Sequence, residues 1–562
     1  MWFEDCGARR GILRPALTGF VLFVVAACAW AAEKPAEHVR VPMTDGTRLA
    51  TDVYLPEGEG PWPAILLRST YGRFFPMEGF LRRGERKAGY ACVMQDLRGM
   101  GTSEGEAHVF YADGWRPGLA DGADTVAWLR AQPWCNGKVA SYGGSALGMT
   151  QMLLAPATRD LAAQAIHRAP ASFYHHALYH GGVFRKNLVE GWLNAVFQPH
   201  LIAVYKAAPS YGPFWAPYDS IAKVSDITAP AVFSGGWHDI FQQGILDAFV
   251  ARERNGGEGA RGRNYLVMNW TPHHGNIPTD YHPTPKNGMV IGTGALEHAL
   301  FDCYLKGDCN ALSNAPKVQY FVMGDDTDPN APGNEWRTAE TWPPFSPTLT
   351  PFYLYSDGGL ATARPSAEAP PLEFVFDPKD PYPTCGGPNL FFNVPHGPHD
   401  RRECGAGRTD LLRFATAPLE EPVEITGRVS ARLYVSTDAP DTDFTAKLLD
   451  IYPEGDGREL NVIDGIHRVK YRTTLERPEP PLTGLDQIVE LEIDLWSTSI
   501  VFHRGHRIGL HVSSSNYPRF EVNPNTGADY PEPGAAMRVA RNRVHCDAAH
   551  PSALILPLRP TP

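Results

Sequence analysis

The sequence lacks the basic and metal-binding patterns that mark several large classes of protein. Its 562 residues carry 62 acidic against 51 basic side chains, a net charge of −11, and no long lysine or arginine run follows the N-terminus. A chain of this sign has no electrostatic footprint for nucleic acid. C-x-x-C and H-E-x-x-H spacings are also absent. A zinc site therefore has little support, and we expect no metal and no organic cofactor.

Long apolar runs are equally scarce. The sequence has one, near the N-terminus, and no other run is of comparable length. The run at 16–29 follows a patch of arginines and ends in the Ala-Trp-Ala of 29–31, the order of a secretory signal peptide. We expect residues 1–31 to be cleaved and the mature chain to be exported, periplasmic or secreted, with no stable membrane span. Two alternatives stay open. One is a retained anchor, and the other is lipid attachment at Cys28, in a segment similar to a lipobox.

Cysteine is sparse in the mature chain, because two of the nine cysteines lie in the leader. An exported protein meets an oxidising compartment, which permits disulfides. The closest pairs along the chain are Cys303 with Cys309 and Cys385 with Cys404, and we expect these two bridges. The alternative is a scatter of buried thiols, because spacing alone does not fix connectivity.

Strand and helix patterns alternate in residues 32–154 and again in 226–343. Apolar alternation on both sides of Asp45-Gly46 predicts a β-hairpin. Short, solid apolar runs predict strands that are covered on both faces, with amphipathic helices between them. The strands are expected at 64–67, 90–95, 138–142, 231–236 and 265–268, and the helices at 121–131 and 147–154. This alternation favours a parallel, doubly wound α/β sheet.

Two other regions differ from this pattern. Residues 155–225 show no strand alternation, and we expect a mostly helical cap inserted there. Residues 344–562 show short alternating segments with turns between them, which is typical of an all-β sandwich or jelly roll. Histidine and aromatic residues crowd the cap, and they are either a substrate wall or one face of a helix packed on the core. These residues are Tyr174, His175, His176, Tyr179 and His180.

Ser145 is the candidate nucleophile. It follows Gly143-Gly144 and precedes Gly148, between an expected strand and an expected helix. A serine on such a sharp turn is forced out of the sheet with its hydroxyl exposed, and the helix N-terminus favours negative charge beside it. The alternative is an ordinary serine in a glycine-rich packing turn.

A serine hydroxyl needs a base, and the base needs an acid to orient it. Asp239 comes directly after an expected strand, and His273 and His274 follow the next one. This order, serine then acid then histidine, is that of α/β-hydrolases. Each residue alone is more often structural, but the three together at successive strand ends point to nucleophilic catalysis.

Six further segments across nearly the whole mature chain carry family-like motifs. They are DGTRLATDVY at 45–54, RSTYG at 68–72, QDLRGMGTSEG at 95–105, STDAPDTDF at 436–444, SSSNYPRF at 513–520 and DAAHP at 547–551. Together they resemble the cocaine esterase and X-Pro dipeptidyl-peptidase hydrolases, called the CocE/NonD family. The resemblance implies an α/β-hydrolase core with an inserted helical cap and a C-terminal all-β jelly-roll domain.

The resemblance also implies roles for individual residues. Ser145 matches the nucleophile, Asp239 the acid, and Tyr71 the phenol that binds the oxyanion. The backbone N–H of Ala146 would be the second oxyanion donor, although the family usually has tyrosine there. His274, directly before Gly-Asn, matches the base better than its neighbour His273, and both stay open because an extra histidine interrupts the usual motif.

These features predict a serine hydrolase that cleaves ester or amide bonds of acyl or aminoacyl substrates through an acyl-enzyme on Ser145. Its partners would be small esters, amides or short peptides, and it could form a homo-oligomer. X-Pro dipeptidyl-peptidase and β-lactam acylase activities stay open, and Glu190 or Asp219 would be the candidates to bind a free amino group. Two remoter hypotheses are a silent hydrolase-fold binding protein and a metal-dependent enzyme or calcium-stabilised lectin. The metal in the second hypothesis would be bound by Asp438, Asp441 and Asp443.

Overall fold

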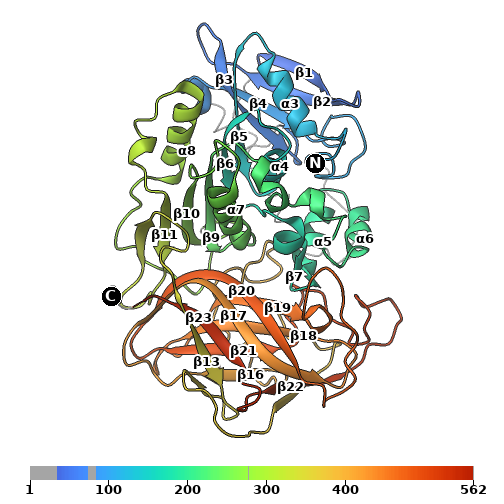
Figure 1. Ribbon diagram of the computed structural model, residues 1–562, viewed down its shortest axis with the longest axis vertical. Helices are drawn as coiled ribbons and strands as arrows, with labels where there is room; N and C mark the ends of the chain where they lie inside the picture. Colours follow the sequence, from blue (N-terminus) through green and yellow to red (C-terminus); the bar gives the residue numbers. More distant parts are fainter. Residues whose placement is uncertain (1–34, 74–83, 276, 561–562) are drawn as a thin grey trace, which may run out of the picture.

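The computed structural model describes residues 35–73, 84–275 and 277–560. The predicted signal peptide and Cys28 lie outside the described residues. Figure 1 shows, in the upper half of the molecule, the domain that the sequence predicts to be an α/β-hydrolase, which is called the hydrolase domain below. A β domain forms the lower half, and the cap helices lie beside the sheet, close to the β domain.

The hydrolase domain is built on a ten-stranded sheet in the order β1-β2-β4-β3-β5-β6-β9-β10-β11-β12. The strands from β4 to β11 in this order pair in parallel, and β1, β2 and β12 are antiparallel additions at the edges. The strands are β1 (Glu37–Pro42), β2 (Arg48–Tyr54), β3 (Trp62–Ser69), β4 (Ala91–Asp96), β5 (Cys135–Gly144), β6 (Leu161–His167), β9 (Ala231–His238), β10 (Tyr265–Pro272), β11 (Val318–Val322) and β12 (Glu335–Ala339).

Helices cover both faces of this sheet, because its central strands are apolar on both sides. Ile65 of β3 packs with Leu300, whereas its neighbour Leu66 packs with Leu129. Successive residues of a strand point to opposite faces. The helix that contains Leu300 and the helix that contains Leu129 therefore lie on opposite sides of the sheet. The helices of this domain are α3 (Asp121–Arg130), α4 (Ala146–Leu154), α7 (Gln242–Asn255) and α8 (Thr293–Phe301), followed by the short turns η4 (Asp302–Lys306) and η5 (Leu312–Asn314).

The predicted hairpin, five strands and two helices are all confirmed within a few residues, and the doubly wound fold with them. The predicted cap boundary is wrong. Strand β6 lies inside the 155–225 segment and pairs in parallel with β5 and β9, so the cap begins only after His167. The cap consists of η1 (Phe173–Leu178), β7 (Tyr179–His180), β8 (Val183–Phe184), α5 (Lys186–Ala195), α6 (His200–Lys206), η2 (Ala216–Tyr218) and η3 (Ile221–Asp226).

The β domain is a sandwich of two antiparallel sheets, as predicted. One has seven strands in the order β14-β13-β23-β17-β22-β15 with β20 on β17, and the other has the order β16-β21-β18-β19. Its elements are β13 (Thr348–Leu354), β14 (Leu360–Ala361), β15 (Leu372–Phe376), β16 (Leu412–Ala415), β17 (Val423–Thr437), β18 (Asp443–Ile451), β19 (Glu459–Arg468), η6 (Val469–Tyr471), β20 (Val489–Phe502), β21 (Arg507–Ser513), β22 (Ala540–His545) and β23 (Ala553–Leu558).

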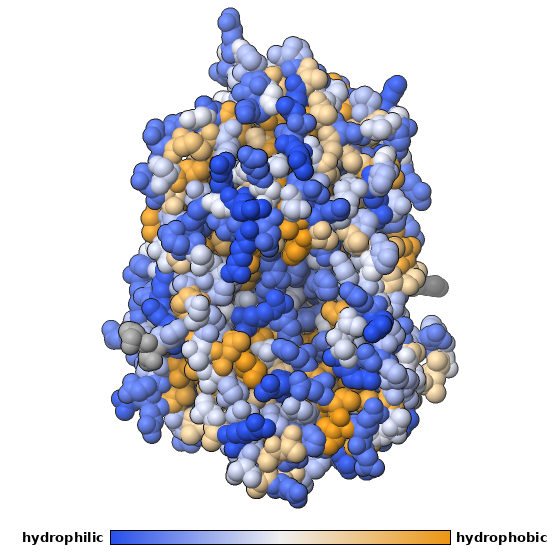
Figure 2. Space-filling view, in the orientation of Figure 1, coloured by the Kyte–Doolittle hydropathy of each residue, from blue (hydrophilic) through white to orange (hydrophobic). Residues whose placement is uncertain are grey.

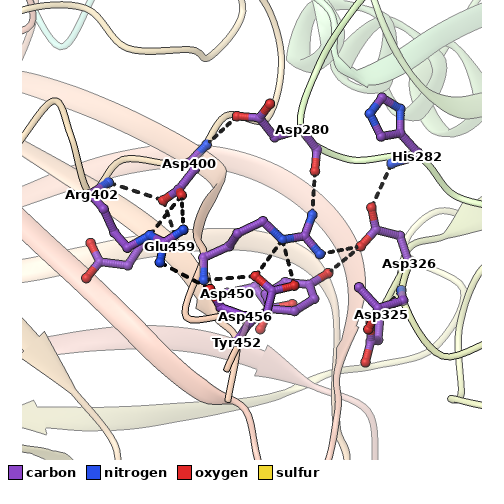
Figure 3. A network of polar contacts seen from close by, with 12 residues as sticks. Asp280, His282, Asp325, Asp326, Asp400, Arg402, Asp450, Tyr452, Asp456 and Glu459 are labelled. Carbon is purple, nitrogen blue, oxygen red and sulfur yellow. Dashed lines mark hydrogen bonds and ion pairs between the residues drawn. The ribbon is translucent and has the colours of Figure 1, made fainter. Parts of the chain in front are cut away.

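A polar network joins the two domains (Figure 3). Arg458 of the β domain donates to the Asp326 carboxylate at 3.0 Å and to the carbonyl of Asp280 at 2.7 Å, both in the hydrolase domain. Asp326 also accepts the Tyr452 hydroxyl at 3.0 Å. Nearby, the ring of His506 lies between two more carboxylates, those of Asp450 and Asp325. The interface therefore fixes how the β domain sits on the hydrolase domain.

The predicted disulfides are both present, Cys303–Cys309 and Cys385–Cys404.

The carboxylates suggested for a calcium site have other partners. Asp443 forms an ion pair with Arg468 at 2.8 Å, Asp441 accepts the amide of Asn523 at 3.0 Å, and Asp438 accepts the backbone N–H of Arg541 at 2.9 Å. These contacts are those of structural carboxylates.

The face drawn in Figure 2 is mainly hydrophilic, and its apolar residues gather in small, separate groups. In the parts of the chain that the structure describes, no helix combines the length and apolarity needed to cross a bilayer.

Candidate active site

Ser145 lies at the turn between β5 and α4, at the carboxyl edge of the parallel strands. Its backbone has φ +52° and ψ −122°, a conformation that is costly for a residue with a side chain and is typical of strained functional turns. The backbone N–H of Ser145 donates to the carbonyl of His167 at the end of β6, at 3.0 Å. The structure thus places the serine on the sharp strand-to-helix turn that the sequence predicts.

The glycines of this turn permit close packing against the end of β6. A Cβ on Gly144 would lie 3.0 Å from the Cβ of His167, and a Cβ on Gly148 would lie 2.7 Å from the Cβ of Ala169. The chain departs from the standard Gly-x-Ser-x-Gly motif because α4 makes its close approach at Gly148, one residue later than usual. The standard glycine position is occupied by Leu147.

Three side chains from three strand ends form one hydrogen-bonded chain. Ser145 Oγ lies 3.0 Å from Nε2 of His273, and Nδ1 of the same ring lies 2.7 Å from Asp239 Oδ2. Asp239 is fully buried, and its other oxygen accepts the backbone N–H of Phe241 at 2.7 Å. Burial opposes ionisation of Asp239, but the charge and hydrogen bond of His273 outweigh it, so the pKa of Asp239 lies below its ordinary value. An ionised Asp239 holds the tautomer in which Nε2 can accept the Ser145 proton.

The prediction that His274 reaches Ser145 is wrong, and its neighbour His273 takes that place. Nε2 of His274 lies 2.7 Å from the carbonyl oxygen of Leu390, in the β domain. A carbonyl only accepts, so this nitrogen carries a proton and cannot act as a base. The sequence motif favours His274, but after β10 the chain turns, and only the first of the two rings faces the serine.

The expected oxyanion donors lie at the ends of two neighbouring strands. Tyr71 follows β3, and its hydroxyl accepts a hydrogen bond from Nε1 of Trp192 at 2.9 Å. Accepting a bond polarises the phenol and strengthens it as a donor. Ala146 is the first residue of α4. A backbone N–H at this position has no acceptor within its own helix and lies at the positive end of the helix dipole.

A pocket opens beside Ser145, and its walls are almost entirely apolar. The rings of Phe110 and Trp192 stack in it, 5.6 Å apart and 12° from parallel. The lining residues are Phe110, Ser145, Ala146, Met149, Phe173, Ala177, Leu178, Leu188, Val189, Trp192, Leu193, Tyr205, Ile240, Phe241 and Leu390. Most come from the cap, so the cap sets the shape of the group that can bind next to the serine.

The described lining of this pocket contains no carboxylate, lysine, arginine or histidine. The two carboxylates considered for binding an amino group are engaged elsewhere. Glu190 forms ion pairs with Lys186 and Lys206, both at 2.8 Å, and Asp219 accepts the Tyr211 hydroxyl at 3.1 Å. A bound ammonium group would have no ionic partner in the described walls, which makes its burial costly.

The aromatic and histidine residues suggested as a substrate wall do not line the pocket. The alternative, one face of a helix, holds only for Tyr174, His175 and His176 in η1, because Tyr179 and His180 form strand β7. The polar tips of the suggested residues bond to other protein groups: Tyr174 to the carbonyl of Pro209, His176 to Asp247, Tyr179 to the carbonyl of Tyr205 and His180 to the carbonyl of Asp494, while His175 packs on Tyr211. The residues of η1 that line the pocket are instead Phe173, Ala177 and Leu178.

Two residues near the site escaped the sequence analysis. Arg168 follows β6 with a positive φ of 44°. Its guanidinium donates to the carbonyl of His273 and to the Thr271 hydroxyl, and lies 3.8 Å from Asp239. It thus supports the loop that carries the imidazole. Leu390 lines the pocket from the β domain, which no local motif indicates. For Arg168, the only signal in the sequence was its position as a positively charged residue directly after a strand. The sequence holds no signal for Leu390.

One group of described residues has the composition of a metal site. Ligand atoms of His545, Asp547 and His550 lie within 4.8 Å of one another, on the connection between β22 and β23. Asp547 Oδ1 already accepts the backbone N–H groups of Ala549 and His550, at 2.8 and 2.7 Å. These contacts explain the cluster as a hydrogen-bonded turn, and none of its residues lines the pocket.

A serine on a strained elbow, joined to a histidine and a buried aspartate at the carboxyl edge of a parallel sheet, defines an α/β-hydrolase. Family models agree with this class. Residues 45–203 match the X-Pro dipeptidyl-peptidase (S15 family) model, and residues 310–555 match the X-Pro dipeptidyl-peptidase C-terminal non-catalytic domain.

The chain is 34% identical to cocaine esterase of Rhodococcus sp. (strain MB1 Bresler), in an alignment that covers 93% of this chain and 98% of that protein. It belongs to the cocaine esterase and X-Pro dipeptidyl-peptidase family and is a serine hydrolase that acts on small-molecule or peptide substrates. Solved structures support the fold. An aminopeptidase from a marine sediment Thaumarchaeota archaeon has a TM-score of 0.78 at 24% identity, with 94% and 98% of the two chains covered. An α-amino acid ester hydrolase has a TM-score of 0.75 at 24% identity, with 98% and 100% covered.

Proposed function

We propose that this serine hydrolase is a carboxylesterase that transfers an uncharged, apolar acyl group from an ester to Ser145 and then to water. The observation that carries the proposal is the direct junction of two features. One is the hydrogen-bonded chain of Ser145, His273 and Asp239, and the other is an apolar pocket whose described walls bear no ionised side chain.

The chemistry follows from the geometry. His273 Nε2 takes the Ser145 proton as Oγ attacks the ester carbonyl, and the resulting imidazolium stays paired with Asp239. The oxyanion is bound by the hydroxyl of Tyr71 and the backbone N–H of Ala146, each worth about 10²- to 10³-fold in rate. The C–O bond then breaks, and the leaving alcohol takes the proton from His273. Water repeats the sequence on the acyl-enzyme and releases the carboxylic acid.

The apolar pocket fits the acyl group better than the alcohol. Ser145 and Ala146 lie in its wall, whereas His273 does not. Because the leaving oxygen must reach His273 to take a proton, the alcohol departs on the side of the imidazole. The acyl group, which stays bonded to Ser145 Oγ, then extends to the other side, into the pocket.

The decisive experiment compares two esters that differ only by an amino group. We expect kcat/KM for p-nitrophenyl 3-phenylpropanoate to exceed that for L-phenylalanine p-nitrophenyl ester by about 100-fold, because burying an unpaired ammonium costs several kcal/mol. Glycyl-proline p-nitroanilide should be a still poorer substrate. A preference for the free-amine ester or for the X-Pro amide would overturn the proposal and favour the aminopeptidase-like alternatives. Ser145→Ala is the control for background hydrolysis.

Export is a second part of the proposal. It is supported by the leader sequence and by the disulfides Cys303–Cys309 and Cys385–Cys404, since such bonds persist in oxidising compartments. Mass spectrometry of the mature N-terminus after expression in a Gram-negative host should find cleavage after Ala31. A diacylated Cys28 would favour the lipoprotein alternative. A homo-oligomer stays a prediction, to be checked by light scattering.

A further inference from the structure

A segment of the β domain, residues 387–397, forms a closed loop that reaches the active site; it is called the bridge loop below. Its ends meet, because Gly387 and Gly397 exchange both backbone hydrogen bonds, at 2.7 and 2.8 Å. Inside it, the side-chain amide of Asn389 donates to the carbonyl of Pro395 at 2.6 Å. The disulfide Cys385–Cys404 brackets the loop. These bonds make the bridge loop a compact unit.

The base of the bridge loop packs on the strand end that carries the catalytic imidazole. A Cβ added to Gly397 would lie 2.9 Å from Cγ of Pro272 and 3.0 Å from Cγ2 of Thr279. Only glycine permits this approach, and Pro272 directly precedes His273. The loop therefore lies against the segment that positions the base.

The tip of the bridge loop contacts the cap and the pocket. Leu390 forms part of the pocket wall. Phe391 packs on Gly191 of α5, where an added Cβ would lie 2.5 Å from the ring. The side chain of Asn187, in the same helix, donates to Asn393 at 2.9 Å. The loop thus spans from the imidazole segment to the helix that forms much of the pocket.

His274 connects this loop to the hydrolase domain. Its Nε2–H donates to the carbonyl of Leu390 at 2.7 Å. Its ring stacks with Phe392, 5.0 Å away and 22° from parallel, and with His396, 5.6 Å away and 27° from parallel. Phe392 is 73% exposed, so the two imidazoles, rather than burial in a core, hold its ring. Burial lowers the pKa of His274, which keeps the ring neutral at pH 7.

We propose that His274 is a positioning residue for substrate selection. It fixes the backbone of Leu390, the one described pocket residue that comes from the β domain, and the bridge loop thereby sets the size of the acyl group that the pocket accepts. The inference rests on the proposed function, since it takes the pocket as the acyl site. It gives a role to the second histidine of the His-His pair, which the chemistry itself does not use.

The test compares a small and a large acyl group in full-length His274→Ala and His274→Gln. We expect His274→Ala to lower kcat/KM for p-nitrophenyl 3-phenylpropanoate about tenfold relative to p-nitrophenyl acetate, mainly through KM, as expected for the loss of one apolar contact surface. The rate of labelling by a small fluorophosphonate should change less than about twofold. His274→Gln keeps an N–H donor for the Leu390 carbonyl and should recover part of the selectivity.

Leu390→Ala is the matched variant on the other side of the contact. It should shift selectivity in the same direction, and the double variant His274→Ala/Leu390→Ala should add little, because both changes remove the same wall. An unchanged ratio of the two esters in His274→Ala would overturn the inference. So would equal losses on both esters with slow fluorophosphonate labelling, which would place His274 in the chemical step. Failure of the proposed function would appear instead in the wild type, as a preference for the free-amine ester.

Discussion

The pocket beside Ser145 and the contact between the two domains differ most in their charge. The described walls of the pocket contain no ionised side chain. The domain contact instead gathers the carboxylates of Asp325, Asp326 and Asp450 (Figure 3), which bond to Arg458 and His506. What distinguishes the two regions is that every carboxylate at the domain contact has a cationic or hydrogen-bonding partner within the protein.

This difference shows how the protein divides its tasks. Polar groups that are fully paired specify one relative position of the two domains, and that position brings the bridge loop to the active site. The pocket contributes only shape and apolar surface, and under the proposed function it would select the acyl group by its size and by its lack of charge. The following four experiments change one of the two regions at a time.

The largest effect is expected in the triad next to the pocket. Ser145→Ala and His273→Ala should each lower kcat on p-nitrophenyl esters by at least about 10⁴-fold, because the members of a triad act as a unit. Stability should be little changed, which thermal unfolding would check. His274→Ala is the adjacent control. If it abolished turnover while His273→Ala stayed active, the assignment of the base would be reversed.

Removal of the central cation from the domain contact should destabilise the fold without affecting the chemistry. Arg458→Met leaves Asp326, whose side chain is 4% exposed, without its cationic partner. We expect a loss of about 3 kcal/mol in the free energy of unfolding, measured with urea. Asp456, whose side chain is 31% exposed, lies 2.8 Å from Nε of the same arginine. Asp456→Asn removes this more exposed partner and should cost less than about 1 kcal/mol. Equal losses of unfolding free energy in the two variants would show that the buried pair of Arg458 and Asp326 stabilises the protein no more than the exposed pair.

The domain contact should also make stability depend on pH. Burial opposes protonation of His506, but hydrogen bonds to Asp325 and Asp450 outweigh it and raise its pKa to about 9. Below pH 6.5 the ring is charged in the folded and unfolded states alike, and its contribution is complete. As the pH rises from there through 9, the contribution is lost, on the order of 3 kcal/mol.

The measurement is the urea midpoint of wild type and His506→Gln between pH 6 and 10. The wild type should lose stability over this range more steeply than the variant. Parallel curves for the two proteins would exclude His506 as the source of the dependence.

The smallest effect is expected from one charge placed in the pocket. Leu188→Asp adds a carboxylate to the wall, and we expect it to shift the ratio of kcat/KM for the 3-phenylpropanoate and L-phenylalanine esters about tenfold toward the free amine. Leu188→Asn adds a polar group of similar size without charge and should shift the ratio much less. An aspartate variant that behaved like the asparagine variant would show that charge does not limit the wild-type pocket.

Much of the core and the triad could be predicted because the relevant signals are local. Ser145, Asp239 and the His-His pair each follow directly after an apolar strand, and the carboxyl ends of parallel strands meet at one edge of a sheet. The choice between His273 and His274 could not be predicted in this way. Adjacent residues in a turn point in different directions, and the partner that captures His274 is the carbonyl of Leu390, which is 116 residues away.

Strand β6 was missed for a different reason. Its centre carries Gln164, which is fully buried, and polar residues weaken the apolar pattern that predicts a covered strand. In the folded protein, Gln164 accepts a hydrogen bond from Arg252 at 2.7 Å and donates to the Ser141 hydroxyl at 3.1 Å. When the hydrogen-bond partners of a buried polar residue lie far away in the sequence, its burial cannot be recognised from its sequence neighbours.

The contribution of Leu390 to the pocket has a consequence for how this protein can change over time. The C-terminal part matches a domain described as non-catalytic, yet its Leu390 forms part of the wall of the pocket beside Ser145. If the pocket holds the acyl group as proposed, recombination that exchanged this half for that of a relative would alter the substrate range even with every residue of the triad retained. Substrate selectivity would then depend on both halves of the chain.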